Sequence, residues 1–161
     1  MVTPGRLILR NYLEQQGWVA NGGEAVIYGN PTYECGAAQI RAHCRQLATV
    51  VTICGVIDDT NLESVSQRTT RFILDEKPFV LDLSAVNSFP SQSISLLCAV
   101  DDACLAAGVE WSLITSPAVE RAMHDDHIEI PATASVPDAL HHFADVRDER
   151  RRLLPLLGKT A

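Results

Sequence analysis

Four serines gather at one junction of the chain: Ser88, Ser91, Ser93 and Ser95, in the stretch SFPSQSISLLCAV at residues 88–100. A serine hydroxyl can cap the first turn of a helix, and it can also accept a phosphoryl group. A strand-like apolar run precedes the junction and a helix-like apolar run follows it. The cluster therefore indicates either turn and capping chemistry or a site at which the protein is switched.

Motifs of the common enzyme classes do not occur in the sequence: it has no G-x-S-x-G elbow, no Walker loop and no G-x-G-x-x-G. A catalytic serine would need a histidine nitrogen within hydrogen-bond reach of its oxygen. Four histidines follow the junction, and only folding could bring one to Ser91: His124, His127, His141 and His142. We therefore expect a protein that is not an enzyme and that needs no cofactor.

The cysteines give no sign of a disulfide framework or a metal site. Their number is odd, and neither C-x-x-C nor a Cys/His metal spacing appears. This pattern favours reduced, mostly buried thiols in a cytoplasmic protein. Exposure of Cys54 or Cys98 would instead favour a redox sensor. The five are Cys35, Cys44, Cys54, Cys98 and Cys104.

Length and composition predict one globular domain. The chain has 161 residues, 47% hydrophobic and 20% charged, which is enough apolar material for a real core. The most apolar stretch, residues 47–57, is too short and too rich in threonine to cross a bilayer. The N-terminus does not resemble a signal peptide, since residues 7–9 are its only apolar patch. We expect no membrane association.

The net charge of −7 is unevenly distributed. Residues 147–161 hold five basic and two acidic side chains, a net of +3, so the remainder of the chain carries −10. An acidic body argues against direct DNA binding. The basic tail is either a solvated helix end or a docking segment for an acidic partner.

Periodicity and turn residues predict an alternating series of strands and helices. A capping box, Thr60 to Glu63, is expected to open the first of these helices, and Gly108 to end the second. Ser116 and Pro117 are a typical helix opening. The expected strands are 37–47, 48–58, 78–86, 109–116 and 128–134, and the expected helices are 60–74, 93–107, 117–125 and 136–154.

Alternation of this kind requires crossover connections, so we expect an α/β fold. The sheet is mixed but largely parallel, with four or five strands and helices packed on it. Residues 1–35 are rich in Gly, Asn and Pro, and we expect them to form a partly ordered N-terminal extension with a short helix at 7–16. We expect residues 36–154 to form the domain and residues 155–161 a C-terminal tail. The apolar surface of the 93–107 helix leaves room for a homodimer face.

Three motifs in order resemble the signature of STAS domains, the fold of bacterial anti-sigma-factor antagonists. In FVLDLSAVNSFPSQSISLL, residues 79–97, the Asp-Leu-Ser matches the family's central strand end. Pro-Ser-Gln-Ser at 90–93 stands where the family has Asp-Ser-Ser-Gly at the start of an apolar helix. GVID at 55–58 resembles Gly-Glu-Leu-Asp, and SPAVERAM at 116–123 is similar to the family's Ser-Pro-Ala-Val-rich helix start.

The resemblance, which spans roughly residues 38–146, implies a STAS-like fold and a partner-switching regulator of transcription. In that family the first serine of Asp-Ser-Ser-Gly is phosphorylated by an anti-sigma factor that is a serine/threonine kinase. The unmodified protein binds the kinase and frees a sigma factor, and phosphorylation ends the binding. By position that serine is Ser91, with Ser93 as the alternative. The implied partner-binding residues are Asp58, Asp59, Pro90, Gln92 and Ser93.

The chain departs from the family at this motif. Pro90 removes a carboxylate and a backbone donor, Gln92 replaces the second serine, and Ser93 replaces the glycine. These changes leave a second function open: an interaction or sensor module whose switch loop is degenerate and is not phosphorylated. Ser91 would then be only a helix cap, and Asp58 and Asp59 only solvated loop carboxylates.

Overall fold

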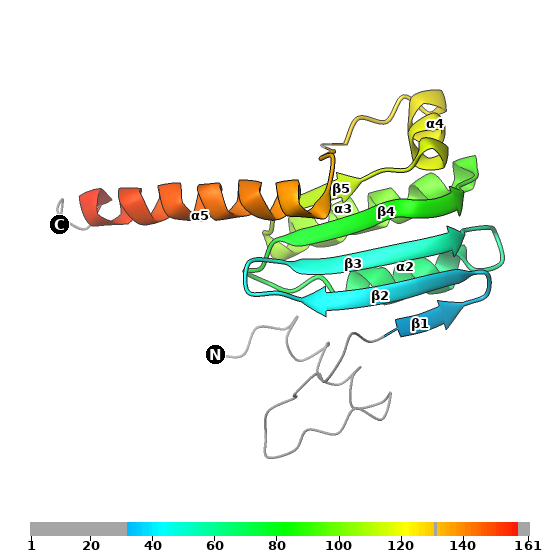
Figure 1. Cartoon of the computed structure of the whole chain (residues 1–161), viewed down its shortest axis with the longest axis horizontal. Coiled ribbons are helices and arrows are strands. Elements are labelled where there is room, and N and C mark those ends of the chain that lie inside the picture. Colours follow the sequence, from blue (N-terminus) through cyan, green and yellow to red (C-terminus); the bar gives the residue numbers. More distant parts are fainter. Residues whose placement is uncertain (1–31, 131, 158–161) are drawn as a thin grey trace, which may run out of the picture.

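The computed structural model describes residues 32–130 and 132–157. Within them lies one five-stranded sheet in the order β1-β2-β3-β4-β5 (Figure 1). The expected helix at 7–16 lies outside the described residues. The strands are β1 Thr32–Cys35, β2 Ala38–Cys44, β3 Thr49–Val56, β4 Phe79–Ser88 and β5 Trp111–Ile114.

The sheet is mixed, as the alternating pattern predicts. β1 and β2, like β2 and β3, are antiparallel neighbours, while β3, β4 and β5 run parallel. The parallel strands are joined through helices because a parallel pair needs a crossover connection. The helices are α2 Leu62–Arg71, a short 3-10 helix Ser91–Ser93 that leads into α3 Ile94–Ala107, α4 Pro117–Asp125 and α5 Val136–Leu157.

Two layers of helix cover the two faces of the sheet. Helices α2 and α3 lie behind the sheet in Figure 1, and the first turns of α5 lie in front of it near β5. The larger core lies under α2, α3 and α4 and includes Phe79, Leu81 and Leu97, which have no exposed surface. The burial of these apolar side chains is the main stabilising term of the domain.

The smaller core lies on the opposite face, under the first turns of α5. There Ala139 and Phe143 of the helix pack on Val50, Val80 and Ile114 of the three parallel strands. Val136 and Leu140 of the same helix are partly buried against this core. The helix then continues beyond the end of the sheet (Figure 1).

Two expected elements are wrong in detail. Residues 128–130 and 132–134 do not form a strand: among them, only one bridge joins Ala132 to Leu113, together with a hydrogen bond from the Thr133 amide to the Leu113 carbonyl. Pro131 has no amide proton to donate to a ladder, which accounts for the missing strand. The capping box is also absent, because Asn61 precedes α2 and no side chain caps its first turn in that way.

The sheet starts at Thr32, before the domain boundary expected at residue 36. Cys35 pairs with Ala38, so Gly36 and Ala37 form a tight two-residue turn, and Gly36 takes a positive φ of 60° there. A glycine at such a position is typical of a hairpin. The Cys-Gly-Ala-Ala sequence is therefore the signal that predicts β1, and the high Gly and Asn content upstream of it hides that signal.

Gly55 opens the GVID motif, and the structure requires a glycine there. Its φ is 97°, and a Cβ atom at this position would lie 2.3 Å from the Ala37 carbonyl oxygen. That carbonyl accepts a hydrogen bond of 3.0 Å from the amide of Val56. The motif thus marks a close approach between the β1–β2 turn and the end of β3.

Candidate functional site

Two loops leave the same edge of the sheet, where the parallel strands β3 and β4 end. A hydrogen bond of 3.1 Å from the Ile57 amide to the Ser88 carbonyl joins the two strand ends. The loop after β3 carries Asp58 and Asp59. The loop after β4, residues 88–93, is called the switch loop below. In open α/β sheets this edge is where ligands and partners bind.

Ser91 and Ser93 have opposite environments in the switch loop. Ser91 is exposed, whereas Ser93 has no exposed surface and its hydroxyl has no hydrogen-bond partner among the described residues. The backbone explains the difference: Pro90 is extended, with φ −67° and ψ 163°, and the Ser93 amide then donates to the Pro90 carbonyl at 2.8 Å. This turn directs Ser93 toward the core beneath the start of α3.

Capping is not the role of either serine. Pro90 and Ser93 precede the 3-10 helix and α3 respectively, and neither helix start has a side-chain cap. Within the described part of the chain, the Ser91 hydroxyl makes no hydrogen bond. By contrast, the expected cap at Ser116 is present, since its hydroxyl accepts the Val119 amide at 3.4 Å.

A hollow of about 370 Å³ lies beside Ser91, between the switch loop and α4. Ser91 and Pro90 line it on one side, and Arg121 and Asp125 of α4 on the other. Arg121 is exposed and has no ion-pair partner among residues 32–130 and 132–157. The hollow therefore places an unpaired cation across from the exposed hydroxyl, a feature that the spacing of the two residues in sequence does not reveal.

The loop after β3 is built around Asp58. Its carboxylate accepts hydrogen bonds from the Thr60 hydroxyl and from the amides of Thr60 and Asn61, at 3.0 and 3.1 Å. The Thr60 hydroxyl, followed by these amides, lowers the pKa of Asp58 below its usual range. The Asp58 side chain is thus half-buried and structural, while Asp59 next to it is exposed.

Asn61 is a residue of this edge that sequence reasoning missed. It is buried, with 3% exposed, and its amide group donates to the Cys35 carbonyl at 3.0 Å and to the Val56 carbonyl at 2.8 Å. Its Oδ1 accepts the Asp58 amide at 2.8 Å. A buried asparagine must satisfy its polar atoms in this way. The only feature of the sequence that indicates this role is the position of Asn61 three residues after Asp58.

The predicted site residues therefore fall at one edge but differ in access. Asp59, Ser91 and Gln92 are exposed, Asp58 and Pro90 are half-buried, and Ser93 is buried. A partner can meet the first group directly. Ser93 cannot be reached by a kinase without local opening of the helix start.

The thiols are less buried than the sequence suggests. All five are free, and only Cys35 and Cys104 are buried, while Cys44 and Cys98 are exposed. Burial, with a smaller effect from Asp101, raises the pKa of Cys104 to about 12, so that this thiol is unreactive near neutral pH. The exposure of Cys98 is the feature expected of a redox-sensing version of the protein.

Other kinds of site can be examined in the described residues. They contain no group of three or more His, Cys, Asp or Glu side chains that could hold a metal ion. No histidine in that part of the chain hydrogen-bonds to a serine oxygen, so no catalytic pair is formed. None of the described helices has the length and apolar character required to span a bilayer.

Comparison with known proteins identifies the family of this fold. The STAS domain family matches residues 39–129. Osmosensory protein A of Mycobacterium tuberculosis is 47% identical to the chain over 140 residues, which cover 83% of this chain and 89% of that protein.

Solved structures with the same fold include an anti-sigma factor antagonist from Mycobacterium paratuberculosis, with a TM-score of 0.57 and 23% identity over 66% of this chain and 94% of the other. The anti-sigma factor antagonist SpoIIAA in its unphosphorylated form gives 0.56 and 10%, over 66% and 96%. A STAS domain protein from Planctomyces limnophilus gives 0.55 and 19%, over 65% and 97%. At these identities the likeness shows a shared fold.

STAS domains are typically regulatory modules without catalytic activity. The family match begins within β2 and ends just after α4, so it includes the switch loop and the loop that carries Asp58. The chain belongs to the STAS domain family.

Proposed function

We propose that this STAS domain protein is an anti-sigma-factor antagonist that binds an anti-sigma factor with serine kinase activity and is switched by phosphorylation of Ser91. The observation that carries the proposal is the exposed Ser91 hydroxyl, which makes no hydrogen bond to the described residues although it stands in the switch loop. A hydroxyl with no structural role at this position is open to modification. Ser93 is the weaker acceptor because its side chain is buried.

A phosphate on Ser91 would be tolerated by the fold. It would lie at the start of the 3-10 helix that leads into α3, where the first amides have no partner within the helix. Arg121 across the hollow would add an attractive cation. The dianion would therefore change the surface of the switch loop and leave the core of the domain unaltered.

The partner would meet the edge formed by Asp58, Asp59, Pro90 and Gln92, with Ser93 buried beneath the switch loop. A new charge of about −1.5 to −2 on the switch loop would repel a partner that fits the unmodified edge. Binding before phosphorylation and release after it would follow. The name of the relative, an osmosensory protein, supports a place for this switch in a response to osmotic stress.

The test is binding to purified anti-sigma kinases by the wild type, Ser91→Ala and Ser91→Glu, each shown by circular dichroism to be equally folded. We expect Ser91→Ala to retain a kinase that Ser91→Glu loses. Gln46→Glu is the matched control, because it adds the same charge at an exposed site on the opposite edge of the sheet. Phosphopeptide mass spectrometry of the native protein should find the phosphate on Ser91.

Equal binding by all the variants, with Ser91 unmodified in cells, would disprove the proposal that phosphorylation of Ser91 is the switch. The second candidate function, a constitutive interaction module with a degenerate loop, would then hold. The feature that favours it is Pro90, which replaces the family's aspartate and leaves the switch loop without that carboxylate. Binding that is constitutive and abolished by Asp59→Arg would identify this module.

A further inference from the structure

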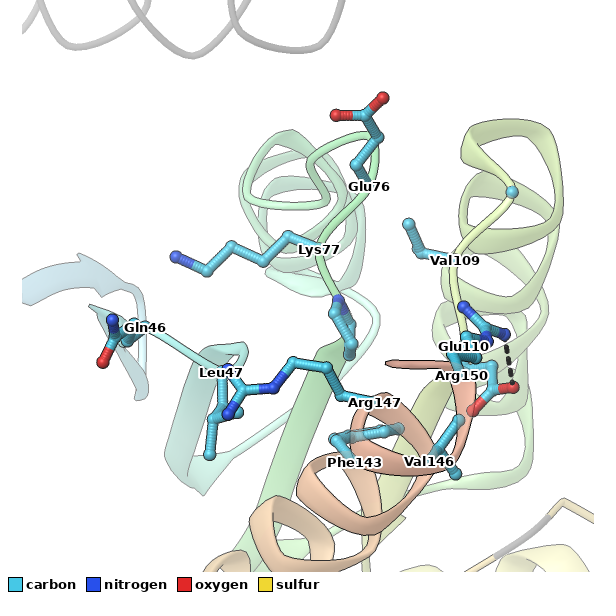
Figure 2. Close-up of a pocket in the computed structure, with 12 residues that line it drawn as sticks. Gln46, Leu47, Glu76, Lys77, Val109, Glu110, Phe143, Val146, Arg147 and Arg150 are labelled. Atoms are coloured by element: carbon cyan, nitrogen blue, oxygen red, sulfur yellow. Dashed lines mark ion pairs between the residues drawn. The ribbon is translucent and has the colours of Figure 1, made fainter. Parts of the chain in front are cut away.

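A second cavity lies at the opposite end of the sheet from the switch loop. It has a volume of about 250 Å³ and opens where the parallel strands begin and where α5 leaves the sheet (Figure 2). Sites for drug-sized ligands usually measure roughly 300–1,000 Å³, so this one suits a smaller molecule.

The walls of the cavity are largely apolar and come from separate parts of the chain. Leu47 precedes β3, Pro78 precedes β4, Val109 precedes β5, and Phe143 and Val146 belong to α5. Leu47, Val109 and Val146 are only half-buried. Apolar surface that is left accessible inside a concavity favours the binding of an apolar group.

The charged groups at the rim are unevenly paired. Arg150 forms an ion pair of 3.6 Å with Glu110, which neutralises one carboxylate. Figure 2 shows the carboxylate of Glu76 pointing away from the side chains of Lys77 and Arg147. Lys77 and Arg147 have no ion-pair partner among the described residues. Two unpaired cations therefore stand beside an apolar cavity in an otherwise acidic protein.

We propose that this cavity binds a small amphiphilic carboxylate, with its apolar body against Val109, Phe143 and Val146 and its carboxylate between Lys77 and Arg147. The arrangement combines a short apolar wall with charge-assisted hydrogen-bond donors, as such a ligand requires. Because α5 supplies a third of the lining residues, the bound ligand would hold this helix against the strand starts. The site is independent of the switch loop, so the proposal does not rest on phosphorylation of Ser91.

The test is a titration of the full-length protein with octanoate, followed by two-dimensional amide NMR. Saturable shifts are expected at the amides of Leu47, Lys77, Val109 and Glu110. Octanol, which has the same apolar body without the charge, should bind at least about tenfold more weakly, which corresponds to about 1.4 kcal/mol. Octylamine should not bind at this site.

The double variant Lys77→Met, Arg147→Met should lose at least about tenfold in octanoate affinity. Its control is Arg151→Met, Arg152→Met, which removes the same charge from exposed positions of α5 outside the cavity and should bind as the wild type does. Equal thermal unfolding of both double variants shows that the fold is retained. Equal binding of octanol and octanoate, shifts that do not saturate or that map elsewhere, or equal losses in the two double variants would each overturn the proposal.

Discussion

Asp58 and Asn61 hydrogen-bond to each other's backbone. The Asn61 Oδ1 accepts the Asp58 amide at 2.8 Å, and the Asp58 Oδ1 accepts the Asn61 amide at 3.1 Å. The Asn61 amide group also reaches the carbonyls of Cys35 and Val56, so one buried side chain connects the ends of β1 and β3 to the start of α2. This reciprocal pair fixes the shape of the loop that presents Asp59.

Replacing Asn61 should therefore destabilise the domain far more than a surface change. Asn61→Ala leaves two carbonyls and one amide in a largely buried place without their partner, and we expect a loss of about 2–4 kcal/mol in the free energy of unfolding. Asn87→Ala, at an exposed asparagine near the other loop, should change it by less than about 0.5 kcal/mol. Urea unfolding measures both, and similar values would contradict the structural role of Asn61.

Gly55 should tolerate no side chain. In Gly55→Ala the new Cβ would meet the Ala37 carbonyl at 2.3 Å on top of the positive φ. The matched variant is Gly108→Ala, which has a φ of 69° and nothing within 4 Å of the new atom, so that it reports backbone strain alone. We expect a loss of about 1–2 kcal/mol for Gly108→Ala and a larger one for Gly55→Ala. Thermal unfolding in which Gly55→Ala is the milder change would disprove the close approach.

Replacing Ser93 by alanine should not reduce the stability of the domain. Its hydroxyl is buried without a partner among the described residues, and a lost hydrogen bond to water is unfavourable by about 1–3 kcal/mol. Ser93→Ala should therefore leave the free energy of unfolding unchanged or raise it by about 1 kcal/mol. Ser95→Ala, at an exposed hydroxyl that donates to the Gln92 carbonyl, gives the comparison. Marked destabilisation by Ser93→Ala would show that the hydroxyl has a partner.

The charge at position 91 should be coupled to Arg121. With Ser91→Glu as a stand-in for the phosphate, a double-mutant cycle with Arg121→Gln should give an attractive coupling of about 0.2–1 kcal/mol, the usual range for an exposed pair. The coupling should fall with added salt. The same cycle with Arg151→Gln on α5 should give none. Zero coupling at Arg121 in low salt would show that Arg121 does not interact with a charge at position 91.

Acid should destabilise the domain partly through His43. Burial, followed by the charges of Arg45 and Arg41, lowers the pKa of His43 below its usual range. As the pH falls below about 6.5, the unfolded chain takes up this proton before the folded one does, so the free energy of unfolding decreases with decreasing pH. His43→Gln should reduce that decrease between about pH 7 and 5, and His124→Gln, at an exposed site, should not. Identical pH slopes in all three proteins would rule out this linkage.

Local chemistry in the sequence determined the strand and helix series from β2 to α4, the parallel connections and the family. These features depend on apolar periodicity, on Gly108 and Ser116 at helix ends, and on motifs whose residues are contiguous. The position of Ser91 just after the carboxyl end of a strand is predictable for the same reason. The missed β1 and the mistaken strand at 128–134 mark where this local information is weakest, because an edge strand depends on its partner more than on its own residues.

Only the tertiary structure decided which hydroxyl is accessible and what surrounds it. Ser91 and Ser93 have the same side chain, and the turn at Pro90 exposes one and buries the other. The hollow shared by Ser91 and Arg121, the bonds of Asn61 and the cavity under α5 each join residues that lie far apart in the chain. Such sites arise where separate elements meet, and their distances are set by how the helices pack on the sheet, which single-residue patterns do not contain.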